Sequence, residues 1–430
     1  MRKKIIVIGG GPAGMMAAIR AAQLGCEVIL LEKNPALGRK LLLSGKGRCN
    51  LTNFCDLDSF LRRFSHQGDF LRSAFKKFFN QDIIDFFQRR GLRLKIERQN
   101  RVFPATDCAE SVVEVLKKEL SKNKVKIIYR CGLFRPIIKE NSVKGVLLKD
   151  GQFLPADALI LATGGISYSF TGSSGYGINL ARRLGHKIIP LRPGLVPLKT
   201  RQRYPLEGLT LKNIRLKFSN SETKIISGIG ELLFTQDGIS GPLVLSLSAK
   251  VVDWLEEKKP VYVEIDLKPA LSKEELDVRL LREFSLQPKK SLKVILKNLL
   301  PKRLIKLFLE ISDINPLRKA NQITRKERES LISLMKSWRL DITGARPIEE
   351  AMVTRGGVCL KQIDPRTMES RLIKGLYFAG EMIDIDADTG GFNLQAAFST
   401  GYLAGESSAL KPGDTLPISR KGLPNDLMNK

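Results

Sequence analysis

A glycine-rich turn near the start of the chain has the residue types and spacing that hold a pyrophosphate. It follows the pattern Gly-x-Gly-x-x-Gly and consists of Gly9, Gly11, Pro12, Ala13 and Gly14. Glycines at these positions allow a tight turn and let phosphate oxygens approach the backbone N–H groups that start the next helix. Glu32 ends the following apolar run, where a carboxylate accepts hydrogen bonds from ribose hydroxyls and disfavours a 2′-phosphate. These residues predict a dinucleotide site.

Two turns near the end of the chain favour FAD over NAD as this dinucleotide. Gly380 and Glu381 follow a buried-strand pattern, and a carboxylate there can bind the ribitol chain of FAD. Gly391, Phe392 and Asn393 open a predicted helix. The free N–H groups of that helix can face the flavin pyrimidine ring and stabilise the negative charge of the reduced flavin. We therefore expect FAD as the cofactor.

A third turn and a missing motif complete the cofactor prediction. Thr163 and Gly164 follow the apolar run 158–161, like the loop near the adenosine half of FAD in many flavoproteins with two dinucleotide folds. No second Gly-x-Gly-x-x-Gly follows a predicted strand. We therefore expect NAD(P)H to act as a transient reductant that has no domain of its own.

Histidine and cysteine usage predicts no metal centre. The chain has two histidines, His66 and His186, which are too few for a histidine-based zinc site and lie far apart in the sequence. The 6 cysteines have no metal-ligand spacing, and we expect free thiols. The apolar run near Met1 is too short for a secretory signal, and no transmembrane segment is predicted, so we expect a cytoplasmic protein.

The elements that must position these turns follow an α/β pattern. Residues 4–8, 15–24 and 27–31 read as a strand, a helix and a strand, and a strand-and-glycine pattern resumes from Ala351. Residues 59–90 have helical spacing of phenylalanine and leucine. The pattern predicts a Rossmann-like domain made of both ends of the chain, with a middle insertion.

The insertion has a different sequence pattern from the two ends of the chain. Short alternating runs over 195–267 predict antiparallel strands, and the leucine- and lysine-rich segment 272–336 predicts helices. The predicted domains are a first FAD-binding part at 1–190, an inserted β-barrel at 191–270 and about 331–350, a basic helical subdomain at 271–330, a second FAD-binding part at 351–410 and a flexible tail at 411–430.

The chain is strongly basic. It has 72 Lys+Arg against 44 Asp+Glu, a net charge of +28. Residues 60–101 hold eleven Lys/Arg against four Asp/Glu, and residues 286–330 hold twelve against four. Such a field attracts RNA, DNA or an anionic membrane surface, although a solvated helical face is the alternative reading. We expect ribosomal RNA or another polyanion as a partner.

Long motifs along the chain resemble the bacterial BaiN/RdsA family of FAD-dependent oxidoreductases, also labelled aminoacetone-oxidase-like. The resemblance covers nearly the whole chain. The motifs that carry it are 38–42, 44–53, 101–104, 172–177, 230–235, 238–242, 354–358 and 378–395. It implies a split FAD domain whose insertion carries a β-barrel and a helical subdomain. With these motifs, we predict further cofactor-binding residues at Lys33, Gly38, Arg39, Lys40, Ser44 and Gly45.

The resemblance leaves the substrate open. Its members include reducers of conjugated C=C bonds, among them steroid enones and a uridine of large-subunit ribosomal RNA, and one label claims oxidation of aminoacetone. The charge favours reduction of a uridine of 23S ribosomal RNA to dihydrouridine. A small-molecule substrate, taken by an enone reductase or an amine oxidase, is the first alternative. A flavin-bearing RNA-binding factor without enzymatic activity is the second.

Reduction of uracil requires two functional groups in the site. Hydride addition at C6 generates an enolate, so a group must protonate C5 and another must stabilise the enolate oxygen. Cys49 is our candidate proton donor, while Arg48 or Asn50 could stabilise the enolate or hold the flavin. In the alternative interpretation Cys49 only packs and the loop only grips FAD. Tyrosine, lysine or water could then supply the proton.

Overall fold

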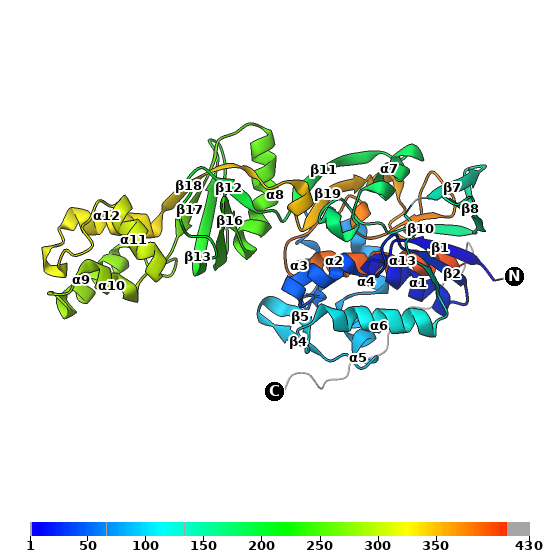
Figure 1. The fold of residues 1–430 in the computed structure, drawn as a ribbon, viewed down its shortest axis with the longest axis horizontal. Coiled ribbons are helices and arrows are strands. Elements are labelled where there is room, and N and C mark those ends of the chain that lie inside the picture. Colours follow the sequence, from blue (N-terminus) through cyan, green and yellow to red (C-terminus); the bar gives the residue numbers. More distant parts are fainter. Residues whose placement is uncertain (1, 66, 133, 411–430) are drawn as a thin grey trace. The chain divides into compact units, whose positions relative to one another are not determined.

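A computed structural model describes residues 2–65, 67–132 and 134–410 (Figure 1). The chain divides into two compact units, one made of Met1–Arg192 with Thr354–Lys430 and the other of Pro193–Val353. The tail 411–430, predicted to be flexible, and His66 lie outside the described residues.

A five-stranded parallel sheet forms the centre of the first unit, with the strand order β20-β10-β1-β2-β6. The strands are β1 (Lys4–Ile8), β2 (Glu27–Leu31), β6 (Lys126–Ile128), β10 (Ala158–Leu161) and β20 (Leu376–Phe378). The run Ile5, Ile6 and Val7 is fully apolar because both faces of the central strand are buried. The sheet confirms the predicted Rossmann-like fold.

Two helices pack closely against each other beside this sheet. They are α1 (Pro12–Gln23) and α13 (Phe392–Ala409), from opposite ends of the chain. A Cβ atom on Gly401 would lie 2.2 Å from the carbonyl oxygen of Ala13, and one on Gly405 would lie 2.3 Å from that of Ala17. These glycines let the second half of α13 approach the first turns of α1 closely.

Short helices and two small antiparallel sheets complete the first unit. The sheets have the orders β3-β5-β4 and β7-β8-β9, and β11 pairs with β19. The strands are β3 (Thr52–Asn53), β4 (Leu94–Glu97), β5 (Arg101–Pro104), β7 (Phe134–Lys139), β8 (Ser142–Leu148), β9 (Phe153–Pro155), β11 (Ile188–Gly194) and β19 (Val353–Val358). The other helices are α2 (Arg39–Leu43), α3 (Leu57–Leu61), α4 (Arg72–Lys77), α5 (Asn80–Gln88), α6 (Ala109–Lys122) and α7 (Tyr176–Arg183).

The helical region expected over 59–90 is broken into α3, α4 and α5. Phe60 lies at the centre of an aromatic cluster, with its ring centroid 5.2 Å from that of Phe75 and 4.7 Å from that of Phe392. Gly68 lies against Leu61, whose carbonyl oxygen would be 2.5 Å from an added Cβ atom. The chain therefore folds back between short helices to bury its phenylalanines on one another, which a single long helix could not do.

The second unit contains a closed antiparallel barrel. Its sheet has the order β14-β13-β15-β16-β12-β18-β17, and an additional pairing between β13 and β17 closes it. The strands are β12 (Leu198–Thr200), β13 (Thr210–Ser219), β14 (Lys224–Ile226), β15 (Gly230–Thr235), β16 (Gly238–Ser240), β17 (Val261–Asp266) and β18 (Trp338–Ala345). A helix, α8 (Pro242–Glu256), interrupts the run that was expected to hold strands only. Its many leucines and valines resemble a strand pattern.

Four helices follow the strand β17 in the second unit and precede β18. They are α9 (Lys273–Leu286), α10 (Leu292–Ile295), α11 (Lys302–Ile311) and α12 (Arg325–Lys336), drawn in yellow-green to yellow in Figure 1. Ser272 and Thr324 start α9 and α12 with capping boxes, in which each side chain accepts a hydrogen bond from the backbone three residues on. Among the described residues, no helix has both the length and the apolar character needed to cross a membrane.

Candidate functional site

The predicted glycine turns come together at the carboxyl ends of β1, β10 and β20. Gly9 has φ +105°, and a Cβ atom on it would lie 2.5 Å from the carbonyl oxygen of Ala162, directly after β10. A Cβ atom on Gly380, the second residue after β20, would lie 2.8 Å from the Cβ atom of Ala13. In parallel α/β sheets, ligands bind outside this edge. The fold therefore gathers three turns that are far apart in the sequence.

The first turn leaves room where a pyrophosphate is expected. Gly11 has φ −79°, a conformation open to any residue, and no atom lies within 4 Å of a Cβ atom built on it. A Cβ atom on Gly14, by contrast, would lie 1.8 Å from the carbonyl oxygen of Gly9. No side chain caps α1 at its start, so the first N–H groups of the helix are open to an anion. The turn fits the phosphates of FAD.

Glu32 is tied to the same turn. Its Oε2 atom accepts a hydrogen bond of 2.7 Å from the backbone N–H of Gly10. Its Oε1 atom accepts bonds from the backbone and the side-chain nitrogen of Asn34, at 2.8 and 2.7 Å. The buried carboxylate is thus oriented by the protein, and Oε2, which accepts one hydrogen bond, keeps lone-pair capacity for a ribose hydroxyl. Asn34 was missed, although it lies only two residues after the predicted ligand.

A four-residue polar cluster joins the loops around the site. The carboxylate of Glu381 accepts hydrogen bonds from Lys40 Nζ at 2.6 and 2.8 Å, from Ser167 Oγ at 2.8 Å and from the backbone N–H of Thr354 at 2.7 Å. Thr354 Oγ1 accepts bonds from the backbone N–H groups of Ile166 and Ser167. Lys40 and Glu381 were predicted separately, and the structure brings them into one ion pair. Ser167 and Thr354 were missed as members of the cluster.

The start of α13 depends on the backbone conformation of Gly391. Gly391 has φ +97°, and a Cβ atom on it would lie 2.5 Å from the backbone of Thr52, so a side chain cannot stand there. No side chain caps the helix, which leaves its first N–H groups open. The cofactor role predicted for Gly391, Phe392 and Asn393 concerns their backbone N–H groups and stays a prediction, while the two side chains have partners within the protein. Phe392 packs in the aromatic cluster, and Asn393 bonds the backbone N–H and carbonyl of Ala387 at 3.0 and 2.8 Å.

The structure places Cys49, the predicted proton donor, in the core, which argues against that role. The Cys49 side chain is 0% exposed and lies in the apolar core. Burial raises the pKa of its thiol to about 12. The thiol is therefore shielded from solvent and stays protonated near neutral pH. These observations favour the alternative interpretation, in which Cys49 only packs.

The Arg48 side chain also has partners within the protein. Its guanidinium forms an ion pair with Glu97 and a 2.7 Å hydrogen bond with Asp107, and lies 4.2 Å from the centre of the Phe103 ring. The hydrogen bonds to Glu97 and then Asp107 raise the pKa of Arg48. Arg48 therefore braces the loop, and the prediction that it stabilises an enolate is not supported.

Several buried polar atoms near the turns have no hydrogen-bond partner among the described residues. They include Asn50 Oδ1, Thr52 Oγ1 and Thr163 Oγ1. A buried polar group without a partner costs roughly 1–3 kcal/mol, so such atoms are expected where a ligand completes the bonds. Asn50 and Thr163 were predicted site residues, whereas Thr52 was missed. The three atoms fit a polar cofactor.

The remaining predicted ligands lie in the loops around α2. Lys33 Nζ bonds Ser174 Oγ at 2.9 Å, Arg39 bonds Asn34 Oδ1 at 2.9 Å, and Ser44 Oγ donates to the Leu41 carbonyl at 2.7 Å. The glycines in this set and in the turn after β10 have left-handed φ angles; they are Gly38 (+71°), Gly45 (+58°) and Gly164 (+73°).

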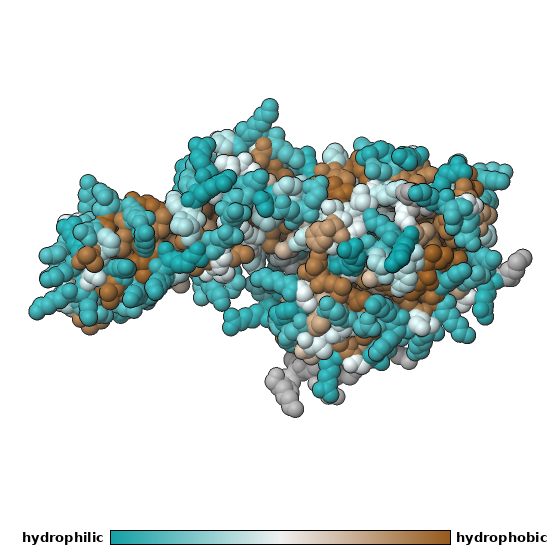
Figure 2. Space-filling view, in the orientation of Figure 1, coloured by the Kyte–Doolittle hydropathy of each residue, from teal (hydrophilic) through white to brown (hydrophobic). Residues whose placement is uncertain are grey.

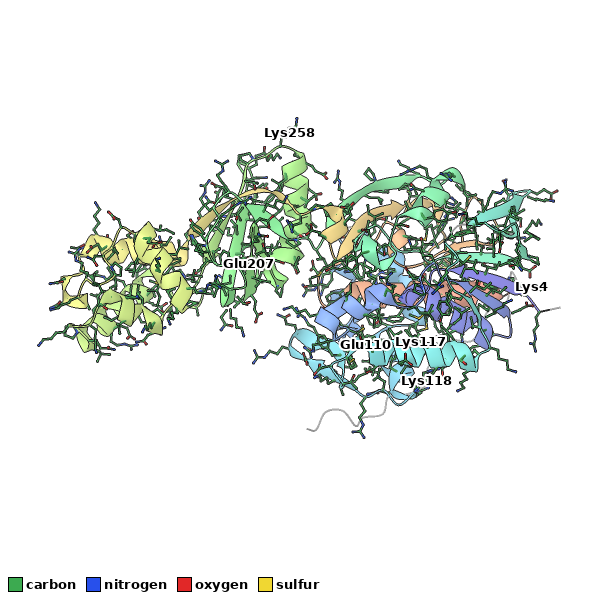
Figure 3. All side chains as sticks on the ribbon, viewed as in Figure 1. Lys4, Glu110, Lys117, Lys118, Glu207 and Lys258 are labelled. Carbon is green, nitrogen blue, oxygen red and sulfur yellow. The ribbon has the colours of Figure 1, made fainter. Side chains whose placement is uncertain are left out.

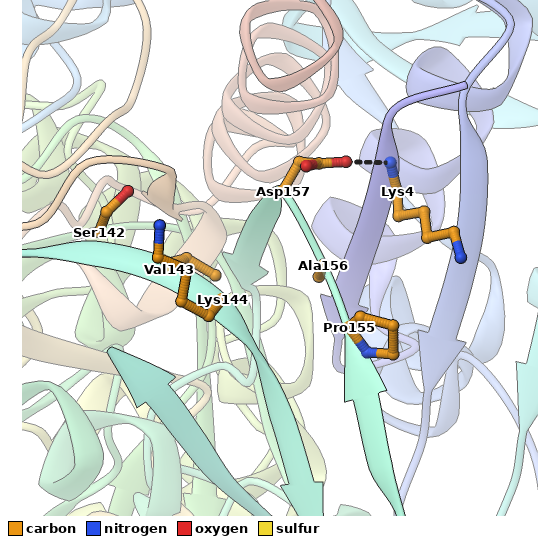
Figure 4. A pocket seen from close by; sticks show the side chains of 7 residues that line it. All are labelled: Lys4, Ser142, Val143, Lys144, Pro155, Ala156 and Asp157. Atoms are coloured by element: carbon orange, nitrogen blue, oxygen red, sulfur yellow. Dashed lines mark hydrogen bonds between the residues drawn. The ribbon is translucent and has the colours of Figure 1, made fainter. Parts of the chain in front are cut away.

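One pocket of the first unit lies away from this site. It measures about 280 Å³, and Lys4 and Asp157 are among its lining residues (Figure 4). The backbone N–H of Lys4 donates a 2.7 Å hydrogen bond to the Asp157 carboxylate. Lys4 begins β1 and Asp157 directly precedes β10, so the pocket lies at the amino ends of these strands. The glycine turns are at the opposite ends, and the pocket is not the dinucleotide site.

The described residues contain no group of three or more His, Cys, Asp or Glu side chains that could hold a metal ion. His186 is buried, with its ring nitrogens 3.2 Å from the Ala181 carbonyl oxygen and 2.7 Å from Ser370 Oγ. Its environment is that of a core histidine with satisfied hydrogen bonds.

Comparisons with known proteins identify the family. The model of the HI0933-like protein Rossmann domain family matches residues 3–407. The 3-dehydro-bile acid delta(4,6)-reductase of Clostridium scindens is 34% identical over 412 residues, which covers 95% of this chain and 100% of that protein. The ribosomal RNA dihydrouridine synthase of Haemophilus influenzae is 34% identical over 400 residues, with coverages of 92% and 96%.

A solved structure agrees in fold. The 3-ketosteroid delta1-dehydrogenase of Sterolibacterium denitrificans has a TM-score of 0.53 at 13% identity, and the match covers 94% of this chain and 99% of that one. The family match and both relatives confirm the resemblance that the motifs indicated. The chain therefore belongs to the HI0933-like family, as a Rossmann-fold oxidoreductase with FAD as its cofactor.

Proposed function

We propose that this protein reduces the C5=C6 bond of a uridine in 23S ribosomal RNA to give dihydrouridine, with NAD(P)H as the electron donor. The bond gains a hydride at C6 and a proton at C5. Bound FAD would supply the hydride chemistry that links a nicotinamide donor to an electron-poor carbon. The two electrons leave NAD(P)H, which is released as NAD(P)⁺.

The choice of RNA as the substrate rests on the net charge of +28. Binding of a small neutral enone gains nothing from an excess of lysine and arginine, whereas an RNA backbone presents a negative charge at every nucleotide. The ribosomal RNA dihydrouridine synthase of Haemophilus influenzae supports this reading, because it matches 92% of this chain.

The residues of the site receive proposed roles within this reaction. We assign the cofactor phosphates to Gly11 and the first turn of α1, the adenosine ribose to Glu32 and the flavin pyrimidine ring to the first turn of α13. Lys40 and Glu381 would hold the loops around the flavin in register. Asn50 stays our candidate for binding either the flavin or the enolate. With Cys49 buried, tyrosine, lysine or water is left to protonate C5.

Reduction of a small conjugated enone is the second candidate. The bile acid reductase of Clostridium scindens is as similar to this chain as the RNA-modifying relative, at 34% identity. Rapid NAD(P)H oxidation that depends on a steroid enone, with no effect of RNA, would favour this candidate.

The test combines a deletion strain with the purified protein. Nucleosides of 23S ribosomal RNA are measured by mass spectrometry in the parent strain, in a strain lacking the gene and in that strain with the gene restored. We expect dihydrouridine to disappear and to return. Purified protein with NAD(P)H should also form dihydrouridine in RNA from the deletion strain. Unchanged dihydrouridine in the deletion strain would refute the proposal.

A further inference from the structure

Two loops of the helical part of the second unit lie side by side. They are residues 288–293, which include the first two residues of α10, and residues 316–321, which follow α11. The backbone N–H of Ala320 bonds the Lys290 carbonyl at 3.0 Å, and that of Leu292 bonds the Arg318 carbonyl at 2.9 Å. We call these two segments the paired loops. They bring together lysines that are about thirty positions apart in the sequence.

The paired loops carry positive charge that no carboxylate neutralises. Lys289, Lys290, Lys293 and Lys319 are exposed, and none of them has an ion pair among the described contacts. The two segments contain no Asp or Glu. Arg318 is different, because it pairs with Glu327 of α12. Four uncompensated ammonium groups on adjoining segments attract a polyanion more strongly than the same number of scattered lysines.

The core of the same subdomain holds this surface in place. Leu292 and Ile295 of α10 and Ala320 of the second loop are buried in the apolar core of the unit. These buried residues therefore hold in place the backbone that carries the four lysines. Figure 2 shows hydrophilic side chains spread over α9–α12, with apolar patches between them.

The arrangement favours RNA over a membrane surface. A helix that binds a membrane presents a continuous apolar face beside its lysines. Most apolar side chains of α10 and α11 are buried instead, with Leu292, Ile295 and Phe308 in the core, and each helix exposes one large apolar side chain, Val294 and Ile311. Leu317 is 76% exposed, but it is the one large apolar side chain that the paired loops expose among the described residues.

We propose that the paired loops bind the phosphate backbone of the RNA substrate through Lys289, Lys290, Lys293 and Lys319. This inference rests on the proposed function and adds a docking site that is separate from the flavin chemistry. Four phosphate contacts predict a salt dependence of about 0.7–0.9 log units of affinity per contact for each log unit of salt. Loss of all four should therefore lower the slope by about three.

The experiment compares two variants with the same loss of charge. The first replaces Lys289, Lys290, Lys293 and Lys319 with Gln. The control replaces four exposed lysines of the first unit with Gln, namely Lys118, Lys122, Lys126 and Lys144. Figure 3 labels Lys118 on α6. Binding of protein-free 23S ribosomal RNA is measured from 50 to 300 mM salt for both variants and the wild-type protein.

We expect the paired-loop variant to bind RNA about tenfold or more weakly near 0.1 M salt and to lose about three units of salt slope, with the control much closer to wild type. For uridine reduction, its KM for RNA should rise while kcat at saturating RNA and reduction of the flavin by NAD(P)H stay unchanged. Equal losses in both variants would overturn the docking site.

Two further outcomes separate this inference from the proposed function. If wild-type protein forms dihydrouridine and the paired-loop variant has an unchanged KM, the docking site fails and the proposed function stands. If the wild-type protein neither binds nor modifies RNA, both fail. Binding to phosphatidylglycerol vesicles that the paired-loop substitutions abolish, without an effect on RNA binding, would assign the surface to a membrane and overturn the RNA proposal.

Discussion

Lys40 Nζ lies 2.6 Å from a carboxylate oxygen of Glu381, although the two residues are 341 positions apart. Both side chains are mostly shielded from water, so the pair is stronger than a surface ion pair. Through this contact the helix α2 is fixed to the turn after β20. The pair thus connects the two separate parts of the chain that form the cofactor site.

Breaking this ion pair should weaken FAD binding and lower stability. We expect Glu381→Gln and Lys40→Met each to reduce the free energy of unfolding by about 1–3 kcal/mol, because each leaves one partner uncompensated. The double variant should lose less than the sum of the single losses. FAD content by absorbance and denaturant unfolding test this prediction, and strictly additive losses would contradict it.

Gly11 and Gly14 should respond differently to alanine. Gly11→Ala has room in the protein, so the chain should fold with a near-normal Tm and lose FAD affinity by about tenfold or more, because the methyl group meets the phosphates. Gly14→Ala places a Cβ atom 1.8 Å from the Gly9 carbonyl oxygen and should lower the Tm itself.

The matched control for these glycines is Gly228→Ala in the second unit, where a Cβ atom meets nothing within 4 Å. It should leave both FAD content and Tm unchanged. Tight FAD binding by Gly11→Ala would show that the open space at this turn does not receive the pyrophosphate.

Cys49→Ala should keep its activity and change the stability at high pH. We expect turnover with bound FAD within about twofold of wild type, because the thiol is buried away from any substrate. The pKa of Cys49 is raised from 9.0 to about 12 in the folded protein. Between these values the unfolded chain has lost the proton that the folded chain keeps, so the thiol's contribution to stability falls as pH rises, by about 1.4 kcal/mol per pH unit.

The alanine variant should lack this part of the decline. Denaturant unfolding of both proteins at pH 8, 9 and 10 measures the difference, and other titrating groups cancel in the comparison. A loss of turnover of a hundredfold or more in FAD-loaded Cys49→Ala would restore Cys49 as a proton donor.

Glu406 should be important for stability without taking part in chemistry. It is buried in α13 and pairs with Arg20 of α1 and with Lys77 of α4, whose Nζ lies 2.8 Å away. Glu406→Gln leaves two cations near an uncharged amide and should destabilise the protein by about 3 kcal/mol. Glu310→Gln, which removes an exposed partner of Lys306, is the control and should cost under about 1 kcal/mol. Similar Tm changes in the two variants would contradict the prediction.

The glycine turn and its neighbours could be predicted from the sequence because their signals are local. The spacing of Gly9, Gly11 and Gly14 between a strand and a helix sets the backbone geometry within six residues. The strand β2 has the bounds that its apolar run predicted, and Glu32 follows it directly. The helix α1 starts earlier than the expected 15–24, at Pro12, because proline suits the first position of a helix.

Long-range packing accounts for the features that the sequence did not indicate. The cluster of Ser167, Thr354 and Glu381 forms because the segments that follow β10 and β20 meet the strand β19, and no local pattern records which side chains meet there. The burial of Cys49 has the same origin, since a glycine-rich loop reads as exposed until neighbouring elements cover it. Local backbone preferences are properties of short segments, whereas contacts between distant residues depend on how all the elements pack.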